Sequence, residues 1–246
     1  MDNTPKLSII LPVRNEAESL RIMVPVLEVN VEVPHEILVV YDFPQDTSVS
    51  AAKWLKEKYD NIFLVLNDLS QGVAGAVKKG VQSAKSDIIL ILPVDEVFPI
   101  IVIRDMLRLV ERGCGFVSCT RYALGGKRLG GSFIGGILSR LANKVFQMAT
   151  GSALTDATTG IKMFKKSVFE RINIEADPVG WSFAFELSIK AQMLDIKIGE
   201  VPVVSVDRLF GGKSTFKLWP WISEYTRWFI WGMRNLDRFK PTRKNT

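Results

Sequence analysis

Residues 88–99 read IILILPVDEVFP, in which three isoleucines and two leucines run into Pro93. Proline cannot donate a hydrogen bond to a strand ladder, so it marks the end of a strand. A near-continuous apolar run of this length is typical of a central strand that is buried on both faces of a sheet. Asp95 and Glu96 follow at once, where open α/β sheets bind their ligands. A carboxylate there can hold Mg²⁺ against a diphosphate, and a solvated acidic loop before the next helix is the alternative.

Strand-like and helix-like patterns alternate on both sides of this stretch. Strands are expected at residues 7–11, 36–41, 62–66, 87–92 and 116–119, with helices near 16–29, 47–58, 73–83 and 99–112. Asn15 is expected to cap the first helix, and Asp46 or Ser48 the second. The connections are short, which predicts parallel neighbours in a doubly wound, mostly parallel α/β sheet.

Polar residues follow each of the expected strands. They are Arg14 and Glu16, Asp42, Asn67 and Asp68, Asp95, and Arg121. Because the carboxyl ends of parallel strands lie at one edge of a sheet, these side chains should meet there. We expect this edge to be the functional site.

The pattern changes after Arg121. A glycine-rich basic loop is expected at residues 125–131, a helix at 133–150, a short strand at 161–164, an amphipathic helix at 183–194 and an extended pair at 196–206. The periodicity of the helix at 183–194 predicts one buried face.

The C-terminal region combines aromatic and basic residues. Six aromatic residues lie close together: Trp219, Trp221, Tyr225, Trp228, Phe229 and Trp231. From residue 208 to residue 246 there are nine Lys and Arg against two acids, a surplus of +7, so the rest of the chain sums to −1. Aromatic amphipathic helices beside basic residues favour a membrane interface, and a helix docked on the core is the alternative.

Composition limits the classes of protein. The 246 residues are 47% hydrophobic and 24% charged, as in an ordinary globular protein. No stretch of 18 apolar residues is free of charge, so no spanning helix is expected, and the start of the chain lacks the basic region of a secretory signal. Cys114 and Cys119 are expected to be buried free thiols, which fits a cytoplasmic chain. The expected location is peripheral, on the cytoplasmic face of a membrane. No nucleic-acid partner is expected.

Several familiar sites are excluded. Gly212-Lys213-Ser214 would need a glycine at position 207 to form a phosphate-binding P-loop, and that residue is Asp207. No GxGxxG fingerprint follows the first strand. The single histidine, His35, cannot build a metal cluster, and it precedes a strand on the wrong side of the sheet for a catalytic triad. What remains is a set of carboxylates with returning arginines and a lysine, which predicts a pocket for a nucleoside diphosphate and a second anion.

The order of motifs resembles the family 2 glycosyltransferases with the GT-A fold, and most of all the dolichol- or polyprenyl-phosphate mannosyl- and glucosyltransferases. The resemblance covers about residues 5–215 and rests on nine motifs in register. They are PVRNE at 12–16, YDFPQDTS at 41–48, QGVAGAVKKG at 71–80, PVDE at 93–96, TRY at 120–122, LSRLANK at 138–144, DATTGIKMF at 156–164, FAFELSIKA at 183–191 and GEVPVVSVDRLFGGKS at 199–214.

This resemblance implies roles for individual residues. Pro12, Glu16 and Asp42 correspond to contacts with the nucleobase and ribose, and Asp95 to the second acid of the DxD metal motif. Arg121 and Arg140 correspond to contacts with an acceptor phosphate. Arg208 and Lys213 correspond to the pair that grips the donor diphosphate and the acceptor phosphate.

The metal motif departs from the family pattern. Its first acid is replaced by Pro93, and Val97 stands where the family has a further polar residue. Asp95 is then the one clear ligand for Mg²⁺ or Mn²⁺, with Glu96 as a candidate helper. One carboxylate with the diphosphate and water can still hold Mg²⁺.

The resemblance implies an inverting transfer of a sugar from a nucleotide-sugar donor to a lipid-phosphate acceptor. The expected domains are a catalytic domain at residues 1–215 and an aromatic, basic helix and tail at 216–246, which would meet the membrane surface or a membrane-protein partner. Two alternatives remain: a glycosyltransferase with a soluble or polysaccharide acceptor, and an inactive glycosyltransferase-like binding or scaffold subunit.

Overall fold

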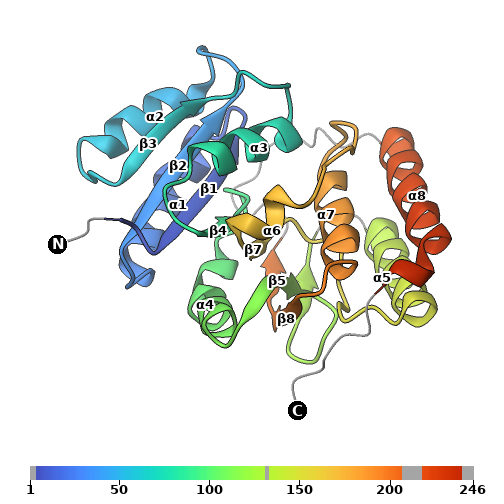
Figure 1. Ribbon diagram of the computed structural model, residues 1–246. Coiled ribbons are helices and arrows are strands. Elements are labelled where there is room, and N and C mark those ends of the chain that lie inside the picture. Colours follow the sequence, from blue (N-terminus) through green and yellow to red (C-terminus); the bar gives the residue numbers. More distant parts are fainter. Residues whose placement is uncertain (1–3, 131–132, 207–217, 240–246) are drawn as a thin grey trace.

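The structure is a computed structural model and describes residues 4–130, 133–206 and 218–239 (Figure 1). Its strands are β1 (Leu7–Val13), β2 (His35–Tyr41), β3 (Ile62–Leu66), β4 (Ile88–Ile91), β5 (Cys114–Thr120), β6 (Lys127–Leu129), β7 (Lys162–Lys165), β8 (Lys197–Pro202) and β9 (Val204–Val206). Its helices are α1 (Ala17–Asn30), α2 (Thr47–Lys56), α3 (Val73–Ser83), α4 (Ile103–Glu111), α5 (Phe133–Thr150), α6 (Lys166–Glu170), α7 (Ser182–Gln192) and α8 (Leu218–Arg234). Two 3₁₀ turns, η1 (Phe98–Val102) and η2 (Leu236–Arg238), complete the elements.

Seven strands form one sheet in the order β3-β2-β1-β4-β7-β5-β8. Neighbouring strands are parallel except β7, which is antiparallel to both β4 and β5. The predicted doubly wound, mostly parallel α/β sheet is therefore confirmed, and the expected central strand, β4, lies in its middle. Short strands β6 and β9 pair in parallel as a separate ribbon, so the expected loop at 125–131 contains a strand.

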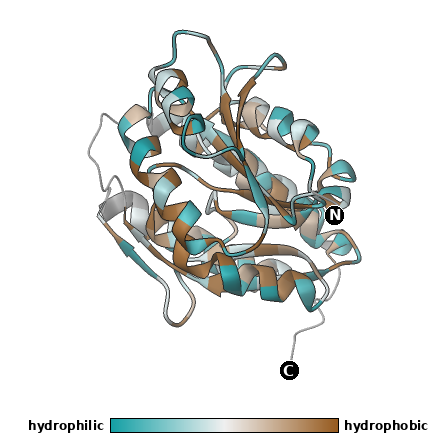
Figure 2. Ribbon diagram, turned by 90° about the vertical axis from the view of Figure 1, so that its left-hand side faces the viewer, coloured by the Kyte–Doolittle hydropathy of each residue, from teal (hydrophilic) through white to brown (hydrophobic). Residues whose placement is uncertain are grey.

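Helices cover both faces of the sheet. One core contains apolar residues of α1, α2 and α4, and the other contains residues of α3, α6 and α7. In Figure 2 the central strands are mainly brown, and the helices carry hydrophilic residues on their outer sides. The small residues of α3 allow close packing: a Cβ on Gly80 would lie 2.6 Å from Cγ2 of Ile10 in β1. The loops that follow the parallel strands lie at one edge of the sheet, at the carboxyl ends of these strands.

The placement of β7 decides what lies at that edge. Lys162 pairs with Ile91 and Lys165 with Ile88, so β7 begins where β4 ends. The residues just before β7 are thereby brought to the carboxyl edge of the parallel strands. The sequence predicted a strand here but not its direction or its neighbours.

Two helices differ from their expected character. Apart from Lys190, every residue of α7 is buried, so this helix lies inside the molecule and is not amphipathic. Helix α8 packs on α5 and α7, and the side chain of Trp228 is 1% exposed. The docked alternative thus holds for one side of α8, while Trp219 at its start is 78% exposed. The expected domain boundary at residue 215 lies outside the described residues.

The remaining expectations concern cysteines and membrane spans. Cys114 and Cys119 are both buried and free, as predicted. Within the described residues, no helix is long and apolar enough to cross a membrane.

Candidate active site

Asp42 lies directly after β2 and organises the start of α3. Its Oδ2 accepts a hydrogen bond from the backbone N–H of Gly72 at 2.9 Å, and its Oδ1 accepts one from Nδ2 of Asn67 at 2.7 Å. A carboxylate has about four acceptor positions, so both oxygens keep capacity for a ligand. Asn67 follows β3, so this hydrogen bond brings together the residues that follow β2 and β3, as predicted.

The loop after β1 is fixed by α2. Asp46 caps α2 through the N–H of Ser48 at 2.8 Å, as predicted, and both its oxygens accept the backbone N–H of Asn15 at 3.0 Å. Asn15 has a φ of +59° and does not cap α1; Glu16 holds that position. This arrangement turns the chain so that Glu16 faces the sheet edge.

Glu16 and Asp95 lie close to each other. Burial raises the pKa of Glu16, and the negative charges of Asp95 and Asp46 add to the rise. The two residues follow β1 and β4, which are neighbours in the sheet. Asp95 is half-buried in a turn in which the N–H of Glu96 donates to the carbonyl of Pro93 at 3.3 Å.

The carboxylates at this edge do not by themselves form a metal site among the described residues. Among the described residues, no three His, Cys, Asp or Glu side chains are grouped so that they could hold a metal ion. Glu96 is half-buried next to Asp95 in the same turn. The residues present therefore fit a divalent ion only where a substrate supplies most of its oxygen ligands.

Arg121, directly after β5, is held by a buried carboxylate. Its Nε donates to Oδ2 of Asp156 at 2.7 Å and its Nη2 donates to Oδ1 of Asp156 at 3.0 Å. The Asp156 side chain is fully buried and the Arg121 side chain is 14% exposed. Burial alone would raise the pKa of Asp156, but the charge of Arg121 and its hydrogen bonds hold that pKa below the usual range.

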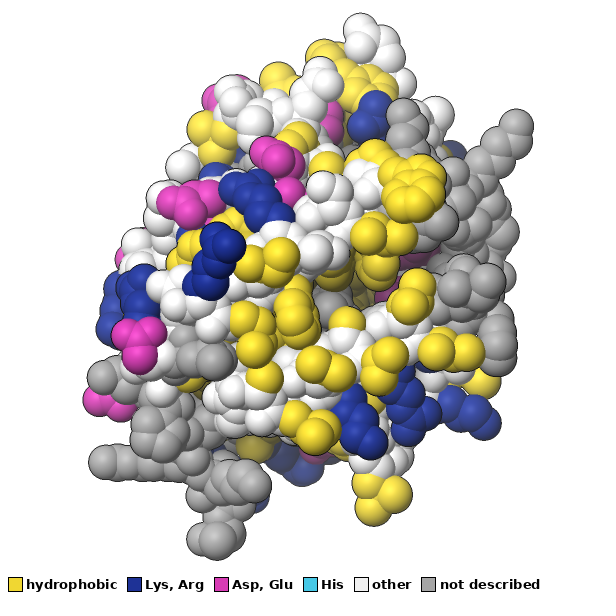
Figure 3. All heavy atoms as spheres, turned by 90° about the vertical axis from the view of Figure 1, so that its right-hand side faces the viewer, with side chains coloured by type: hydrophobic (Ala, Val, Ile, Leu, Met, Phe, Trp, Pro, Cys, Tyr) yellow, Lys and Arg dark blue, Asp and Glu magenta, His cyan; other side chains and the backbone are white. Residues whose placement is uncertain are grey.

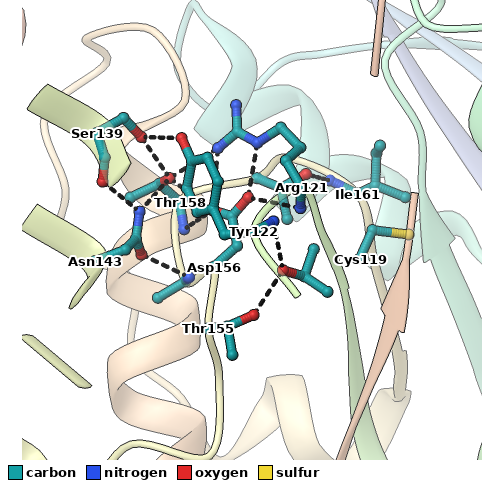
Figure 4. Close-up of polar contacts among 12 residues, drawn as sticks. Cys119, Arg121, Tyr122, Ser139, Asn143, Thr155, Asp156, Thr158 and Ile161 are labelled. Carbon is teal, nitrogen blue, oxygen red and sulfur yellow. Dashed lines mark hydrogen bonds and ion pairs between the residues drawn. The ribbon is translucent and has the colours of Figure 1, made fainter. Parts of the chain in front are cut away.

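The third guanidinium nitrogen of Arg121 is directed away from Asp156. Figure 4 shows this nitrogen pointing away from Asp156, with no dashed contact to the other residues drawn. Nη2 also donates to Oγ1 of Thr158 at 3.0 Å. The guanidinium is thus fixed in direction while one N–H₂ group stays available for an anion.

Two residues of α5 extend the polar group. Nδ2 of Asn143 donates to Oγ1 of Thr158 at 3.1 Å, and Oη of Tyr122 donates to Oγ of Ser139 at 2.9 Å (Figure 4). Ser139 and Asn143 are one helical turn apart and therefore share the inner face of α5. We refer to Arg121, Tyr122, Ser139, Asn143, Asp156 and Thr158 as the Arg121 cluster.

Lys162 and Glu200 lie beneath the Arg121 cluster. Nζ of Lys162 donates to Oγ of Ser118 at 2.7 Å, and Oε1 of Glu200 accepts the backbone N–H groups of Thr155 and Asp156 at 2.9 and 3.0 Å. Burial lowers the pKa of Lys162 to about 8, although Asp156 and Glu200 oppose the shift. Burial also raises the pKa of Glu200. Two cations and two carboxylates are thus enclosed together.

The residues predicted from the sequence divide into three groups. Glu16, Asp42, Asp95 and Arg121 meet at one sheet edge, and Pro12 lies in β1 beside Val40 of β2, on the same side of the site. Arg140 is exposed on α5, while its neighbour Ser139 is buried and contacts Tyr122 and Thr158. Arg208 and Lys213 lie outside the described residues.

Sequence reasoning did not assign roles to the residues that hold Arg121. Asp156, Ser139 and Asn143 stand inside motifs that were recognised, but strand and helix periodicity gave them no function. Lys162 and Glu200 carried a detectable signal, since each is a charged residue beside apolar neighbours in a strand, Met163 and Phe164 for Lys162 and Val201 for Glu200.

Comparison with known proteins gives a family match and several relatives. A family profile described as Glycosyl transferase family 2 matches residues 8–172. A dolichol-phosphate mannosyltransferase of Pyrococcus furiosus is 26% identical over 231 residues, which cover 91% of this chain and 64% of that protein. An undecaprenyl-phosphate 4-deoxy-4-formamido-L-arabinose transferase of Yersinia enterocolitica is 28% identical over 171 residues, 67% of this chain and 50% of that protein. The chain therefore spans less than two thirds of the length of these two curated relatives.

A solved structure has the same fold. A mannosyltransferase from Pyrobaculum calidifontis, in complex with GDP-Man and Mn²⁺, has a TM-score of 0.65 at 21% identity, over 94% of this chain and 65% of that chain.

Proposed function

Because the chain belongs to glycosyl transferase family 2, we propose that it transfers a sugar from a nucleoside-diphosphate sugar to a polyprenyl phosphate, with inversion at the sugar carbon. The observation that carries this proposal is the fixed guanidinium of Arg121, which presents an open N–H₂ group at the sheet edge that also holds Glu16, Asp42 and Asp95. Carboxylates suit the hydroxyls and metal of a nucleotide, and a fixed guanidinium suits a phosphate. One edge therefore offers places for a donor and for an anionic acceptor.

On the donor side, Pro12, Glu16 and Asp42 contact the nucleobase and ribose. Asp42 is suited to this role because its contacts with Gly72 and Asn67 fix its carboxylate while leaving acceptor positions open. Asp95 would hold a Mg²⁺ or Mn²⁺ ion together with diphosphate oxygens. Such an ion would supply positive charge to the departing diphosphate.

On the acceptor side, the phosphate lies against Arg121, and Arg140, which is exposed on α5, is proposed as a second contact. An oxygen of this phosphate attacks C1 of the sugar, the bond from C1 to the diphosphate breaks, and the nucleoside diphosphate leaves with that electron pair. A phosphomonoester has a second pKa of roughly 6 and is mostly dianionic at pH 7, so the nucleophile needs little help from a general base. The protein mainly orients two repelling anions and neutralises their charge. Arg208 and Lys213 are proposed to grip the diphosphate and the acceptor phosphate.

The exposed side chains of α5 and α8 are an argument for a lipid acceptor. Figure 3 shows hydrophobic side chains gathered on this face, with Lys and Arg side chains beside them. On α5 the exposed apolar residues are Ile137, Leu138, Leu141, Val145 and Met148. We call these five residues the α5 stripe. Leu124, which follows Tyr122 in the loop after β5, is 99% exposed.

A solvent-exposed apolar stripe next to basic side chains is suited to an anionic membrane surface. The stripe lies on the helix that also carries Ser139 and Asn143, so an acceptor phosphate at Arg121 would be close to the lipid. The names of the curated relatives, which specify dolichol phosphate and undecaprenyl phosphate, support the same class of acceptor. We propose that the protein acts from the cytoplasmic face of a membrane, at its surface or on a membrane-protein partner.

The proposal is tested by turnover with a panel of nucleotide sugars, undecaprenyl phosphate in vesicles, and Mg²⁺ or Mn²⁺. We expect one donor to yield a glycosylated lipid phosphate, and undecaprenol, which lacks the phosphate, to give no product. Transfer only to a soluble acceptor such as 3-phosphoglycerate would refute the lipid part. A folded protein that binds no GDP, UDP or nucleotide sugar would instead be a scaffold subunit.

A further inference from the structure

The segment at residues 173–181, between α6 and α7, connects the α8 helix to the donor side of the site. Figure 1 shows the chain between α6 and α7 passing between α3 and α8. We call residues 173–181 the connecting segment. No function was assigned to it from the sequence, and its residues form neither a strand nor a helix.

Two buried carboxylates hold the backbone of the connecting segment. Oε1 and Oε2 of Glu186 on α7 accept the N–H groups of Glu175 and Ala176, both at 2.7 Å. Oε1 of Glu224 on α8 accepts the next N–H group, that of Asp177, at 3.0 Å. Three consecutive backbone donors are therefore fixed by charged acceptors, which form stronger hydrogen bonds than neutral ones.

Glu224 is itself held in place. It is 5% exposed, and it accepts Nε1–H of Trp228 at 2.8 Å and Nη1–H of Arg227 at 3.2 Å. Arg227 also pairs with Oδ2 of Asp177 at 3.3 Å. A buried carboxylate needs such partners to offset the loss of water, and here each partner belongs either to α8 or to the connecting segment.

The other end of the connecting segment contacts the sheet edge. A Cβ on Gly72 would lie 3.1 Å from Cβ of Pro178, so Pro178 packs directly on the glycine whose N–H binds Asp42. A Cβ on Gly160 would lie 2.5 Å from Cε3 of Trp181. Gly72 starts α3 and Gly160 lies just before β7, so the connecting segment touches the site at two places.

We propose that Glu224 is a positioning residue for the nucleotide-sugar donor. It fixes the connecting segment, and through Pro178 it fixes Gly72 and the carboxylate of Asp42. This inference rests on the proposed function, because it takes Asp42 as a donor contact. It adds that α8, which lies on the membrane-facing side of the molecule, sets the affinity for the soluble donor.

The test compares Glu224→Ala, Glu224→Gln and Pro178→Gly with the wild-type protein. GDP and UDP, each with Mn²⁺, are titrated by calorimetry, and donor KM and kcat are measured with the best nucleotide sugar. Glu224→Ala should weaken nucleotide affinity and raise donor KM by about fivefold to tenfold, the size of one ordinary hydrogen bond because the effect on the donor is indirect, with kcat and acceptor KM nearly unchanged. Glu224→Gln keeps an acceptor oxygen for Asp177 and should recover most of the affinity. Pro178→Gly, at an exposed position, should change donor KM in the same direction even if Glu224→Ala fails to fold.

Phe229→Leu is the matched control. Phe229 also anchors α8, with its ring centroid 5.8 Å from that of Phe146 on α5, and it carries no group that could accept a hydrogen bond from the connecting segment. This variant should lose stability and keep donor affinity. Equal losses of affinity in Phe229→Leu and Glu224→Ala would overturn the proposal, as would unchanged donor KM in Pro178→Gly. A wild-type protein that binds neither GDP nor UDP would instead refute the proposed function.

Discussion

Arg121 shows how a buried ion pair can serve binding. Two of its guanidinium nitrogens are committed to Asp156 and Thr158, which leaves the third in a fixed direction. The planar fork of arginine makes this possible, whereas the ammonium group of lysine is a single point of charge. The buried carboxylate of Asp156 therefore serves to orient the Arg121 guanidinium, which contacts the substrate in the proposed mechanism.

Arg121→Lys should separate charge from geometry. The variant keeps a cation beside Asp156 but loses the fork, so affinity for a phosphate-bearing acceptor should fall by about 1.5–3 kcal/mol. Titration with undecaprenyl phosphate in detergent measures this change, and circular dichroism checks the fold. Wild-type acceptor affinity in the folded variant would mean that Arg121 serves only the structure.

Asp95→Asn should remove most sugar transfer without unfolding the protein. Asp95 is half-buried beyond β4, and the substitution preserves its shape while removing its charge. Loss of this charge should also lower the pKa of the neighbouring Glu16. Turnover and Mn²⁺-dependent GDP binding are measured on the same preparation. Near-native turnover would make Asp95 an ordinary loop residue.

At the scale of elements, two helices share the roles expected of the C-terminal helix. Helix α8 packs on the core, and α5 carries the exposed apolar side chains proposed to meet the membrane. Trp228 of α8 is buried, and removing it would cost about 3–5 kcal/mol, so a truncation before α8 would damage the core as well as the surface. Among the described residues of these two helices, five exposed large apolar side chains lie on α5 and two, Trp219 and Ile230, on α8. Point substitutions on α5 are therefore the cleaner probe of membrane contact.

Leu141→Glu and Met148→Glu should weaken binding to anionic liposomes by about tenfold or more, since each removes a large apolar side chain from the contact. Both residues are exposed, so the fold should be unaffected. Binding of the wild-type protein should weaken with added salt, because Arg140 and Lys144 contribute through screened attraction. Ile101→Glu, at an exposed position outside α5 and α8, is the control. Equal binding by all four proteins would place the membrane contact elsewhere.

Features set by local sequence were predicted correctly, whereas features that depend on contacts between distant parts of the chain were not. The strands from β1 to β5 and the GT-A fold were predicted, because apolar runs and recognised motifs are local, and the family match and the solved relative confirm the fold. The antiparallel position of β7 was not predicted, because strand pairing depends on partners about 45 and 75 residues away in the chain. Asp156 and Lys162 received no role for the same reason, because their partners Arg121 and Ser118 are also distant in the chain. The assignments of Arg208 and Lys213 stay predictions.

At the scale of the whole molecule, enclosed charge makes stability depend on pH. In the unfolded chain Lys162 keeps its proton to about 10.5, whereas in the folded chain its pKa is about 8. Between these values the unfolded state binds more protons, so raising the pH favours the folded state; below about 8 both states are protonated and the effect disappears.

Lys162→Met should remove this dependence. We expect the free energy of unfolding of the wild-type protein, measured with guanidinium chloride, to gain relative to that of Lys162→Met between pH 8 and pH 9. The variant also removes the cation beside Glu200 and leaves Asp156 with Arg121 alone, so it should be less stable at pH 7. Parallel curves for the two proteins across pH 7–9 would show that Lys162 is not buried in its charged form.

The antiparallel strand β7 also has a consequence for synthesis on the ribosome. Strands β4 and β5 are made first, yet they never pair with each other; each pairs with β7, which is made later than both. Until about residue 165 has emerged, β4 presents an unpaired edge, and β5 has no partner in the growing sheet. Nascent chains arrested at residue 160 should therefore be cut readily by protease within residues 114–120, and chains arrested beyond β8 should resist. The last strand to join the middle of the sheet is the one that closes the gap between its two halves.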